Sequence, residues 1–324
     1  MSFLNILPKI LPGTFLGWGL GANDASNIFG TAVANNIIKF YHAAILASIF
    51  VIVGSFLEGP KTFDTVGGLA AITKGDLAAI TLGAAVSVAF FTYLKLPIST
   101  SQALVGSILG IGIIKGSDID LKILLKIVLC WITTPLGAFI IGFILYAFIK
   151  WIFSKFNYGV LFYSIFIKVG ILLAGIMGSY SLGANNVGNV TGIYAVHMKI
   201  ANLPFGLSSD RFWALLGGIS IAIGIMTYSK RVMETVGKKI TNMLPMMALI
   251  SVVAQSITVY IYTNVGVPVS TSQAIVGAVA GVGAVHGFSS VNFKSIGRIA
   301  IGWLMTPIAA GAVAIGTYFL FKLF

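Results

Sequence analysis

Two asparagine-rich motifs contain oxygen ligands that could bind a cation. The first spans residues 21–27 (Gly-Ala-Asn-Asp-Ala-Ser-Asn), and residues 183–189 (Gly-Ala-Asn-Asn-Val-Gly-Asn) repeat its pattern. In a helix, Asn23 and Asn27 would share one face because they are four residues apart. The leading Gly-Ala pairs predict a tight helix break that exposes backbone carbonyls. These oxygens suit a small hard cation such as sodium, and helix–helix hydrogen bonding by asparagine is the structural alternative.

Asp24 is the one acidic residue that apolar stretches flank on both sides. The chain has eight acidic residues, and the other seven lie in or beside predicted loops. A carboxylate inside a membrane costs several kcal/mol unless a cation or a water-filled cavity compensates it, so we predict a functional role for Asp24. The alternative is a carboxylate that only caps a helix beginning at Ala25, which is worth about 1 kcal/mol.

A second pair of motifs offers hydroxyl and amide groups to an anion. Residues 99–102 and 270–273 both read Ser-Thr-Ser-Gln, follow a proline and precede an apolar run. Ser-x-x-Gln is a capping box. In it, the Ser99 hydroxyl would cap a backbone amide of the helix, and the Gln102 side chain would reach back to the backbone N–H of Ser99. The box leaves the two middle residues unexplained. Free backbone amides at two helix N-termini, together with hydroxyl groups, form an anion site without a basic side chain.

Charge balance connects the two kinds of motif. If both copies meet in mid-membrane, four helix N-termini, near residues 24, 100, 186 and 271, converge on one point. No Lys, Arg or His lies inside the four motifs. A phosphate dianion beside the Asp24 carboxylate would total about −3, which is unstable at low dielectric without counter-ions. Binding about two or three sodium ions would neutralise this charge. The motifs therefore predict obligatory cotransport, although the residues alone leave sulfate open as the anion.

The elements that must hold these motifs are membrane helices. Of the 324 residues, 58% are hydrophobic and 9% are charged, and the mean hydropathy is +1.01. A soluble domain is about a quarter charged, so the composition excludes a soluble globular protein, a disordered chain and a nucleic-acid binder. The net charge of +12 is explained by basic cytoplasmic loops that set topology in a lipid bilayer. The length allows about 10 to 12 membrane segments.

The apolar segments form two sets, and several of them are too short to span a membrane alone. Such short segments predict discontinuous helices or re-entrant hairpins. The first set comprises residues 3–20, 24–38, 41–57, 77–94, 98–114 and 121–149, and the second comprises residues 158–182, 187–200, 211–228, 245–263, 268–285 and 295–323.

The two sets repeat each other in order. Residues 97–106 match residues 268–277 at eight of ten positions, and residues 131–135 (Trp-Ile-Thr-Thr-Pro) match residues 303–307 (Trp-Leu-Met-Thr-Pro). Internal repeats with polar interruptions at matching positions are typical of secondary transporters.

Loop charge indicates how the repeats are oriented. The predicted loop 58–76 has two basic and three acidic residues, whereas its mate, 229–240, has four basic residues and one acidic residue. The positive-inside rule places 229–240 in the cytoplasm and 58–76 outside. We therefore predict an all-α polytopic membrane protein with two inverted-topology repeats, 1–150 and 151–324, and a site at their interface.

The combination of motifs resembles the inorganic phosphate transporter (PiT) family. The matching stretches are both asparagine-rich motifs, both Pro-x-Ser-Thr-Ser-Gln segments and residues 230–237, and they spread over nearly the whole chain. The resemblance implies an inverted-repeat fold in a cell membrane and symport of inorganic phosphate with sodium, or with protons in some bacterial members. It also implies arsenate as a competing ion and, commonly, a homodimer. Some bacterial relatives carry phosphate as a metal complex.

The resemblance further implies roles for individual residues. The sodium ligands would be Asn23, Asp24, Asn27, Asn185, Asn186 and Asn189, joined by Ser99 and Ser270, which are alternatively phosphate ligands. The phosphate ligands would be Thr100, Ser101, Gln102, Thr271, Ser272 and Gln273. Two positions depart from the family pattern, since Asn186 stands where many relatives have aspartate and Val51 stands where some eukaryotic relatives have glutamate. Both departures remove carboxylates, which leaves the ion stoichiometry open and favours sodium over a simple proton relay.

Sodium-coupled phosphate import by alternating access, without an organic cofactor, is the leading functional hypothesis. A proton-coupled or metal-phosphate symporter and an anion channel with the same site are the alternatives. An intramembrane enzyme acting on lipid phosphates is disfavoured, because no motif combines a nucleophile, a base and metal ligands. The sequence therefore predicts a transporter rather than an enzyme.

Overall fold

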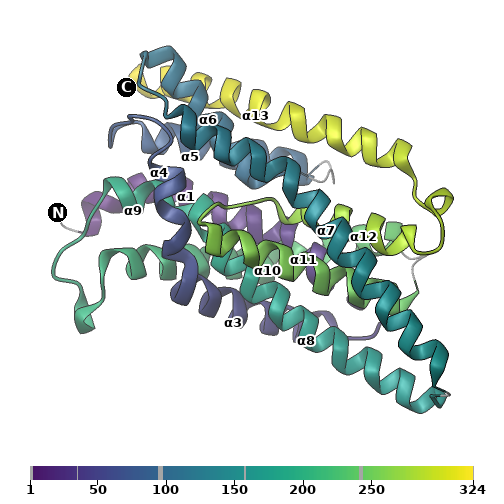
Figure 1. Cartoon of the computed structure of the whole chain (residues 1–324). Helices are drawn as coiled ribbons and strands as arrows, with labels where there is room; N and C mark the ends of the chain where they lie inside the picture. Colours follow the sequence, from purple (N-terminus) through teal and green to yellow (C-terminus); the bar gives the residue numbers. More distant parts are fainter. Residues whose placement is uncertain (1–2, 35, 94–97, 157, 241–243, 324) are drawn as a thin grey trace.

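The computed structural model describes residues 3–34, 36–93, 98–156, 158–240 and 244–323 (Figure 1). Apart from one isolated bridge between Ala70 and Ile119, the regular structure in these ranges is helical. The all-α fold class predicted from composition is therefore confirmed for the described chain.

The first half of the chain forms long helices interrupted by short ones. In chain order its elements are α1 (Phe3–Asp24), α2 (Ser26–Ala34), α3 (Phe40–Glu58), a 3-10 turn (Gly59–Thr62), α4 (Phe63–Gly67), α5 (Leu77–Tyr93), α6 (Thr100–Lys115) and α7 (Leu121–Lys155).

The second half is likewise built of long helices joined by short helical elements. Its elements are α8 (Val160–Val187), a π-helical turn (Gly188–Gly192), α9 (Ile193–His197), a 3-10 turn (Pro204–Gly206), α10 (Ser209–Ile240), α11 (Pro245–Val265), α12 (Thr271–Ala284), a 3-10 turn (Phe288–Ser290) and α13 (Phe293–Lys322).

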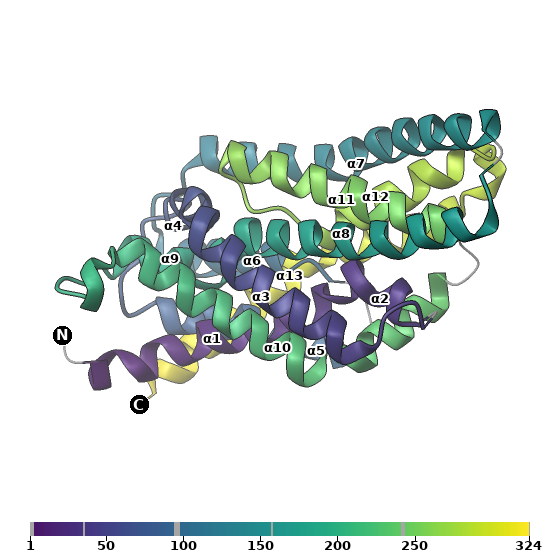
Figure 2. The same ribbon diagram turned by 90° about the horizontal axis from the view of Figure 1, so that it is seen from below.

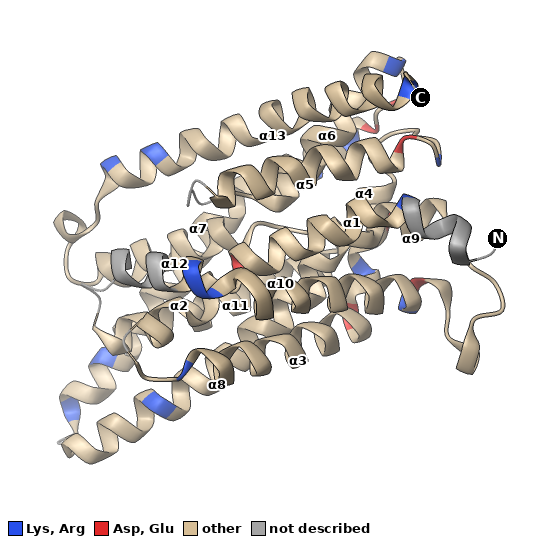
Figure 3. Ribbon diagram, turned by 180° about the vertical axis from the view of Figure 1, so that it is seen from behind, with Lys and Arg blue, Asp and Glu red and all other residues tan. Residues whose placement is uncertain are grey.

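The outer surface of the helix bundle is apolar, as a lipid-facing surface must be. Within the described ranges, six helices are long and apolar enough to cross a membrane, and α5, α6 and α12 are shorter apolar helices. On α13, for example, Ile301, Leu304 and Ile308 are all more than half exposed. Lys and Arg residues lie mainly toward helix ends and loops (Figure 3). The predicted total of about 10 to 12 membrane segments stays a prediction.

The two halves pack against each other through reciprocal helix contacts. Helix α1 packs on α10, and its repeat mate α8 packs on α3; in the same way α7 packs on α12 and α13 packs on α6. At each crossing a glycine lies where a Cβ would overlap a backbone carbonyl of the partner helix: Gly21 faces Ile221, Gly183 faces Val51, Gly277 faces Pro135, and Gly106 faces Pro307. Small residues let membrane helices approach this closely. Each contact recurs with the two halves of the chain exchanged.

Repeat-related helices run in opposite directions along the bundle. In Figure 1, α7 runs from left to right, whereas its mate α13 runs from right to left. Helix α1 starts at the left of the same view, whereas its mate α8 ends on that side. Seen from below, α11 lies between α7 and α8 (Figure 2). Its repeat mate α5 contacts the corresponding helices, α13 and α1.

Two predictions about segment ends are wrong. The predicted gap between segments 158–182 and 187–200 is helical, because α8, the π-helical turn and α9 run without interruption from Val160 to His197. The predicted loop 229–240 is the C-terminal part of α10, which extends to Ile240. Its lysines, glutamate and methionine are good helix formers, so charge alone did not mark a helix end there.

Candidate functional site

The first asparagine motif lies at a kink between two helices. Helix α1 ends at Asp24 and α2 begins at Ser26, so the predicted break is present and falls at Ala25. The Ser26 hydroxyl donates a hydrogen bond to the carbonyl oxygen of Asn23 at 2.7 Å, which satisfies a backbone group that the kink leaves without a helical partner. Gly21 is not the hinge, because its lack of a side chain serves the contact of α1 with α10.

Asp24 is buried and meets the second half of the chain. Its Oδ2 accepts a hydrogen bond from Thr271 Oγ1 at 2.8 Å, and its Oδ1 has no hydrogen-bond partner among the described residues. The carboxylate bonds a side chain of α12 and not an amide of α2, so a helix cap does not account for it. An ionised carboxylate with a single hydroxyl partner in this setting requires a compensating cation.

Asn23 and Asn27 do not share one face, contrary to the sequence expectation. The kink at Ala25 separates them, so each contacts a different helix. Asn23 Nδ2 donates to Thr92 Oγ1 of α5 at 3.1 Å, whereas Asn27 Nδ2 lies 3.4 Å from Ser272 Oγ of α12. The motif therefore connects α5 on one side and α12 on the other.

The second asparagine motif lies inside a continuous helix. Helix α8 passes through Gly183 and Asn186 and continues into the π-helical turn. The predicted break at Gly183, with its exposed carbonyls, and the predicted helix N-terminus near residue 186 are therefore wrong. Gly183 instead allows α8 to approach the backbone of Val51 on α3, while a π-helical turn of this kind often marks a functional site.

Asn185 holds the extended segment that leads into α12. Its Nδ2 donates to the carbonyl oxygen of Val267 at 3.0 Å, and its Oδ1 accepts from the backbone amide of Val269 at 2.7 Å. Asn186 Nδ2 lies 3.4 Å from Asn185 Oδ1, and Asn189 Nδ2 donates to Asn186 Oδ1 at 3.0 Å. This chain of amides ends at Asn189 Oδ1, which has no partner among the described residues.

Both Ser-Thr-Ser-Gln motifs begin a helix, as predicted. Ser99 and Ser270 are the N-caps of α6 and α12, and each hydroxyl accepts from a glutamine backbone amide, of Gln102 and Gln273, at 3.3 Å. The reverse half of the capping box is not formed, since both glutamine Oε1 atoms lack a hydrogen-bond partner among the described residues. The glutamine side chains are therefore free for another role.

Ser272 joins the motifs of the two halves. Its Oγ donates to the carbonyl oxygen of Ile98, just before α6, at 3.1 Å. The same hydroxyl lies beside Asn27, and the preceding Thr271 bonds Asp24. Segments separated by 174 to 247 residues thus form one buried site. Pro97, which precedes the first Ser-Thr-Ser-Gln motif, lies outside the described residues.

The site is rich in oxygen atoms that lack partners. Five buried oxygens of the four motifs have no hydrogen-bond partner in the described chain: Asp24 Oδ1, Thr100 Oγ1, Gln102 Oε1, Asn189 Oδ1 and Gln273 Oε1. None of the residues of the four motifs is basic, so the motifs themselves supply no positive charge to balance a bound anion. The arrangement can hold small cations beside an anion.

Glu58 and Asp76, two acidic residues outside the site, are paired with lysines. Glu58 contacts Lys61 at 2.6 Å, and Asp76 contacts Lys115 at 2.7 Å. Burial alone would raise the pKa of the Asp76 carboxyl, but hydrogen bonds from Lys115 and Thr73 outweigh it and hold this pKa below its usual range. Asp24 lacks any such partner, which distinguishes it from these structural carboxylates.

Comparison with known proteins identifies the family. The family profile described as the phosphate transporter family matches residues 20–314. The chain belongs to the phosphate transporter family. This transporter is 29% identical to a protein of Methanocaldococcus jannaschii named a phosphate permease, with 95% of both chains covered. It is also 29% identical to a Bacillus subtilis protein named a low-affinity inorganic phosphate transporter, over 94% of this chain and 93% of that one.

A solved structure shares the fold of the transporter. The structure, described as a sodium-dependent phosphate transporter, aligns with a TM-score of 0.85 at 23% identity and covers 99% of this chain and 100% of that chain. The chain is thus a multi-pass membrane transporter and not an enzyme, as the sequence predicted.

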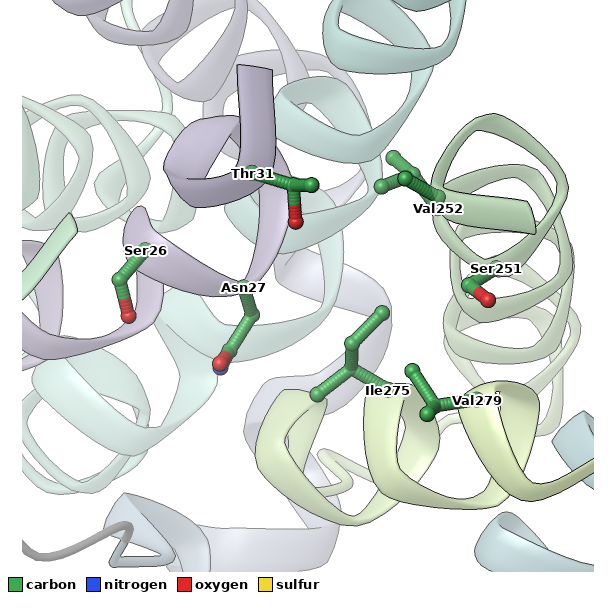
Figure 4. Close-up of a pocket in the computed structure, with 8 residues that line it drawn as sticks. Ser26, Asn27, Thr31, Ser251, Val252, Ile275 and Val279 are labelled. Atoms are coloured by element: carbon green, nitrogen blue, oxygen red, sulfur yellow. The ribbon is translucent and has the colours of Figure 1, made fainter. Parts of the chain in front are cut away.

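A small cavity of the transporter lies beside Asn27 (Figure 4). It has a volume of about 10 Å³ and lies between α2, α11 and α12, with Thr31 and Ser251 among its polar lining and Val252 and Ile275 among its apolar lining. Such a volume holds about one water molecule. A cavity of this size does not admit a phosphate ion.

Sequence reasoning missed two polar residues next to the site and a third that is buried on the neighbouring helix α11. Thr92 bonds Asn23, Ser251 lines the cavity, and Gln255 on α11 is buried with its Oε1 unpartnered among the described residues. Thr92 and Ser251 give no signal in sequence, because hydroxyl side chains are common in membrane helices. The amide of Gln255 inside an apolar segment was the detectable signal.

Proposed function

We propose that this transporter imports inorganic phosphate together with sodium ions by alternating access. The observation that carries the proposal is the buried contact of Asp24 with Thr271 at 2.8 Å. It brings a carboxylate to the N-terminus of α12, where backbone amides favour an anion. A carboxylate and an anion repel each other at this range unless cations lie between them, so substrate and ions must bind together.

The proposed site has two parts with different chemistry. Sodium binds the oxygens of the asparagine motifs, where Asp24 Oδ1 and Asn189 Oδ1 have no other partner among the described residues. Phosphate binds the amides and hydroxyls at the starts of α6 and α12, from Thr100, Ser101 and Gln102 and from Thr271, Ser272 and Gln273. The descriptions of the relatives as phosphate permeases and of the solved neighbour as sodium-dependent support these assignments.

Alternating access follows from two inverted repeats, which we propose as residues 1–150 and 151–324. Support comes from the reciprocal glycine contacts and from the opposite directions of α7 and α13 (Figure 1). Two inverted copies can exchange conformations, and such an exchange opens the shared site to opposite sides of the membrane in turn. The homodimer implied by the family resemblance stays a prediction.

The decisive test is uptake of radiolabelled phosphate into proteoliposomes, with sodium, proton and potassium gradients imposed separately. We expect saturable uptake that requires an inward sodium gradient and that arsenate inhibits. Uptake that follows the proton gradient and ignores sodium would replace sodium coupling with proton coupling. Large phosphate currents without any cation requirement would indicate a channel.

Removing a hydroxyl from the phosphate part should weaken phosphate binding more than sodium binding. Ser272→Ala deletes the group that joins Asn27 to the segment before α6, and Ser101→Ala deletes its repeat mate. A hydrogen bond to a charged group contributes about 1.5–3 kcal/mol, so the phosphate KM should rise about tenfold or more in each variant. The measurement is uptake as a function of phosphate at saturating sodium, and of sodium at saturating phosphate.

Ser87→Ala is the matched control for these serine variants. Ser87 is buried in α5, and its hydroxyl donates a hydrogen bond to the Gly83 carbonyl of its own helix. We expect both constants to stay at the wild-type values in this variant. Equal increases of the phosphate and sodium constants in Ser272→Ala would argue against separate sites for the two ions.

A further inference from the structure

Two tryptophans at equivalent positions of the repeats have a buried indole N–H that lacks a partner. Nε1 of Trp131 on α7 and Nε1 of Trp303 on α13 are buried and make no hydrogen bond within the described chain. The indole groups of Trp18 and Trp213 do donate hydrogen bonds, at 2.9 and 3.0 Å. A buried indole N–H normally finds an acceptor, so the shared exception in both repeats requires an explanation.

The packing of α12 on α7 places an acceptor at the level of the first tryptophan. The glycine contacts that set the register are Gly277 on Pro135 and Gly281 on Phe139. The residue numbers rise together on the two helices, so α12 and α7 are parallel at this contact. One turn toward the N-terminus, the same register puts Gln273 and Trp131 at the same level of the two helices. Gln273 Oε1 is the unpartnered acceptor described above.

The reciprocal contact between the halves, α6 of the first on α13 of the second, has the same register. Here the contacts are Gly106 on Pro307 and Gly110 on Gly311, and one turn earlier they put Gln102 of α6 at the level of Trp303 of α13. Gln102 Oε1 is again without a partner among the described residues. At both of these contacts between the halves, an indole N–H and a glutamine carbonyl oxygen that lack partners in the described chain therefore lie at matching levels of neighbouring helices.

We propose that Trp131 and Trp303 are positioning residues for the phosphate ligands Gln273 and Gln102. This inference rests on the proposed function. A glutamine binds an anion through its amide N–H groups, and its carbonyl oxygen must then point away from the anion. An indole N–H is a donor only, so it bonds the carbonyl oxygen and not the amide nitrogen. Each tryptophan thus turns its glutamine so that the N–H groups face phosphate.

The two bonds belong to the phosphate-bound state of the transporter. In the present structure, donor and acceptor are adjacent in register but not bonded to each other. The proposal requires a change of the glutamine rotamer that brings Oε1 to the indole N–H in the phosphate-bound state. Phosphate favours this rotamer by binding the amide nitrogen, and the indole favours it by binding the oxygen.

The test removes the N–H donor while it keeps an aromatic ring. Trp131→Phe and Trp303→Phe should each raise the phosphate KM in proteoliposomes about tenfold, with the sodium half-saturation and the maximal rate within about twofold of wild type. Trp131→His retains a ring N–H and should recover part of the phosphate affinity. Trp151→Phe is the control, because Trp151 lies on the same helix with its side chain exposed.

The outcomes separate this inference from the function on which it rests. If the wild type takes up phosphate with sodium and Trp131→Phe has the same phosphate KM, the positioning role is wrong. A lower maximal rate without a change in KM would show a packing role and would also overturn it. The Kd for phosphate, measured on purified protein in detergent, should rise by the same factor of about ten. This measurement also tests a variant that folds but transports poorly. Wild-type vesicles without phosphate uptake would reject the proposed function itself.

Discussion

Asp24→Asn is expected to reduce sodium-driven phosphate uptake about a hundredfold or more while the protein remains folded. Asparagine has the same shape as aspartate, and its amide oxygen can keep the hydrogen bond from Thr271, which is 2.8 Å long in the wild type. What the variant loses is the negative charge, together with an oxygen that has no other partner in the described chain. Removing one member of a buried charge pair costs about 3–5 kcal/mol, which corresponds to more than a hundredfold in affinity.

The measurement for Asp24→Asn is phosphate uptake as a function of sodium concentration, together with a check of folding by size-exclusion chromatography in detergent. Asp210→Asn is the matched control, because Asp210 pairs with Lys199 at 2.7 Å outside the site and its side chain is 42% exposed. This control should transport like the wild type. Unchanged uptake and sodium half-saturation in Asp24→Asn would mean that Asp24 only accepts the Thr271 hydrogen bond.

Gly183→Ala is expected to destabilise the folded transporter by about 1–3 kcal/mol, the usual range for overpacking. An added Cβ would overlap the carbonyl oxygen of Val51, so α8 and α3 would have to separate. Alanine is the better helix former by about 1 kcal/mol, which by itself would stabilise α8. A net loss of stability in Gly183→Ala would therefore come from the steric overlap with Val51. Thermal unfolding in detergent, followed by tryptophan fluorescence, should show a lower midpoint.

Gly302→Ala provides the matched control for Gly183→Ala. Gly302 is also inside a helix, α13, and a Cβ there would meet no atom within 4 Å in the described chain. Its midpoint should equal or exceed the wild-type value. Gly21→Ala should behave like Gly183→Ala, because its Cβ would overlap the carbonyl oxygen of Ile221 in the reciprocal contact. If Gly183→Ala and Gly302→Ala were equally stable, the close approach of the helices would not depend on glycine.

The closed cavity beside Asn27 relates the packing to transport. With room for about one water molecule, the space between α2, α11 and α12 does not admit phosphate. Opening there must move α12, whose first turn bonds Asp24. Under the proposed function, movement of α12 would change both this cavity and the contact of Thr271 with Asp24, which would couple ion and substrate.

Much of the chemistry was determined by the sequence itself. The apolar composition defines the bilayer as solvent, since a chain with 9% charged residues cannot cover a soluble surface. Inside lipid, polar side chains are costly, so the few polar motifs in apolar segments had to be functional or tightly bonded. For this reason Asp24 and both Ser-Thr-Ser-Gln motifs were found without coordinates, and their repetition predicted two related halves.

The partners of these residues were decided only by the tertiary structure. No local pattern specifies that Asp24 meets Thr271, which is 247 residues away, because that contact depends on how whole helices cross. The same limit explains the errors. A Gly-Ala pair reads as a possible break, yet at Gly183 the glycine serves close helix packing and the helix continues through a π-helical turn. Likewise, the kink at Ala25 separated two asparagines whose spacing fits one helical face. Local spacing gives the geometry of an ideal helix, whereas long-range packing decides where that geometry holds.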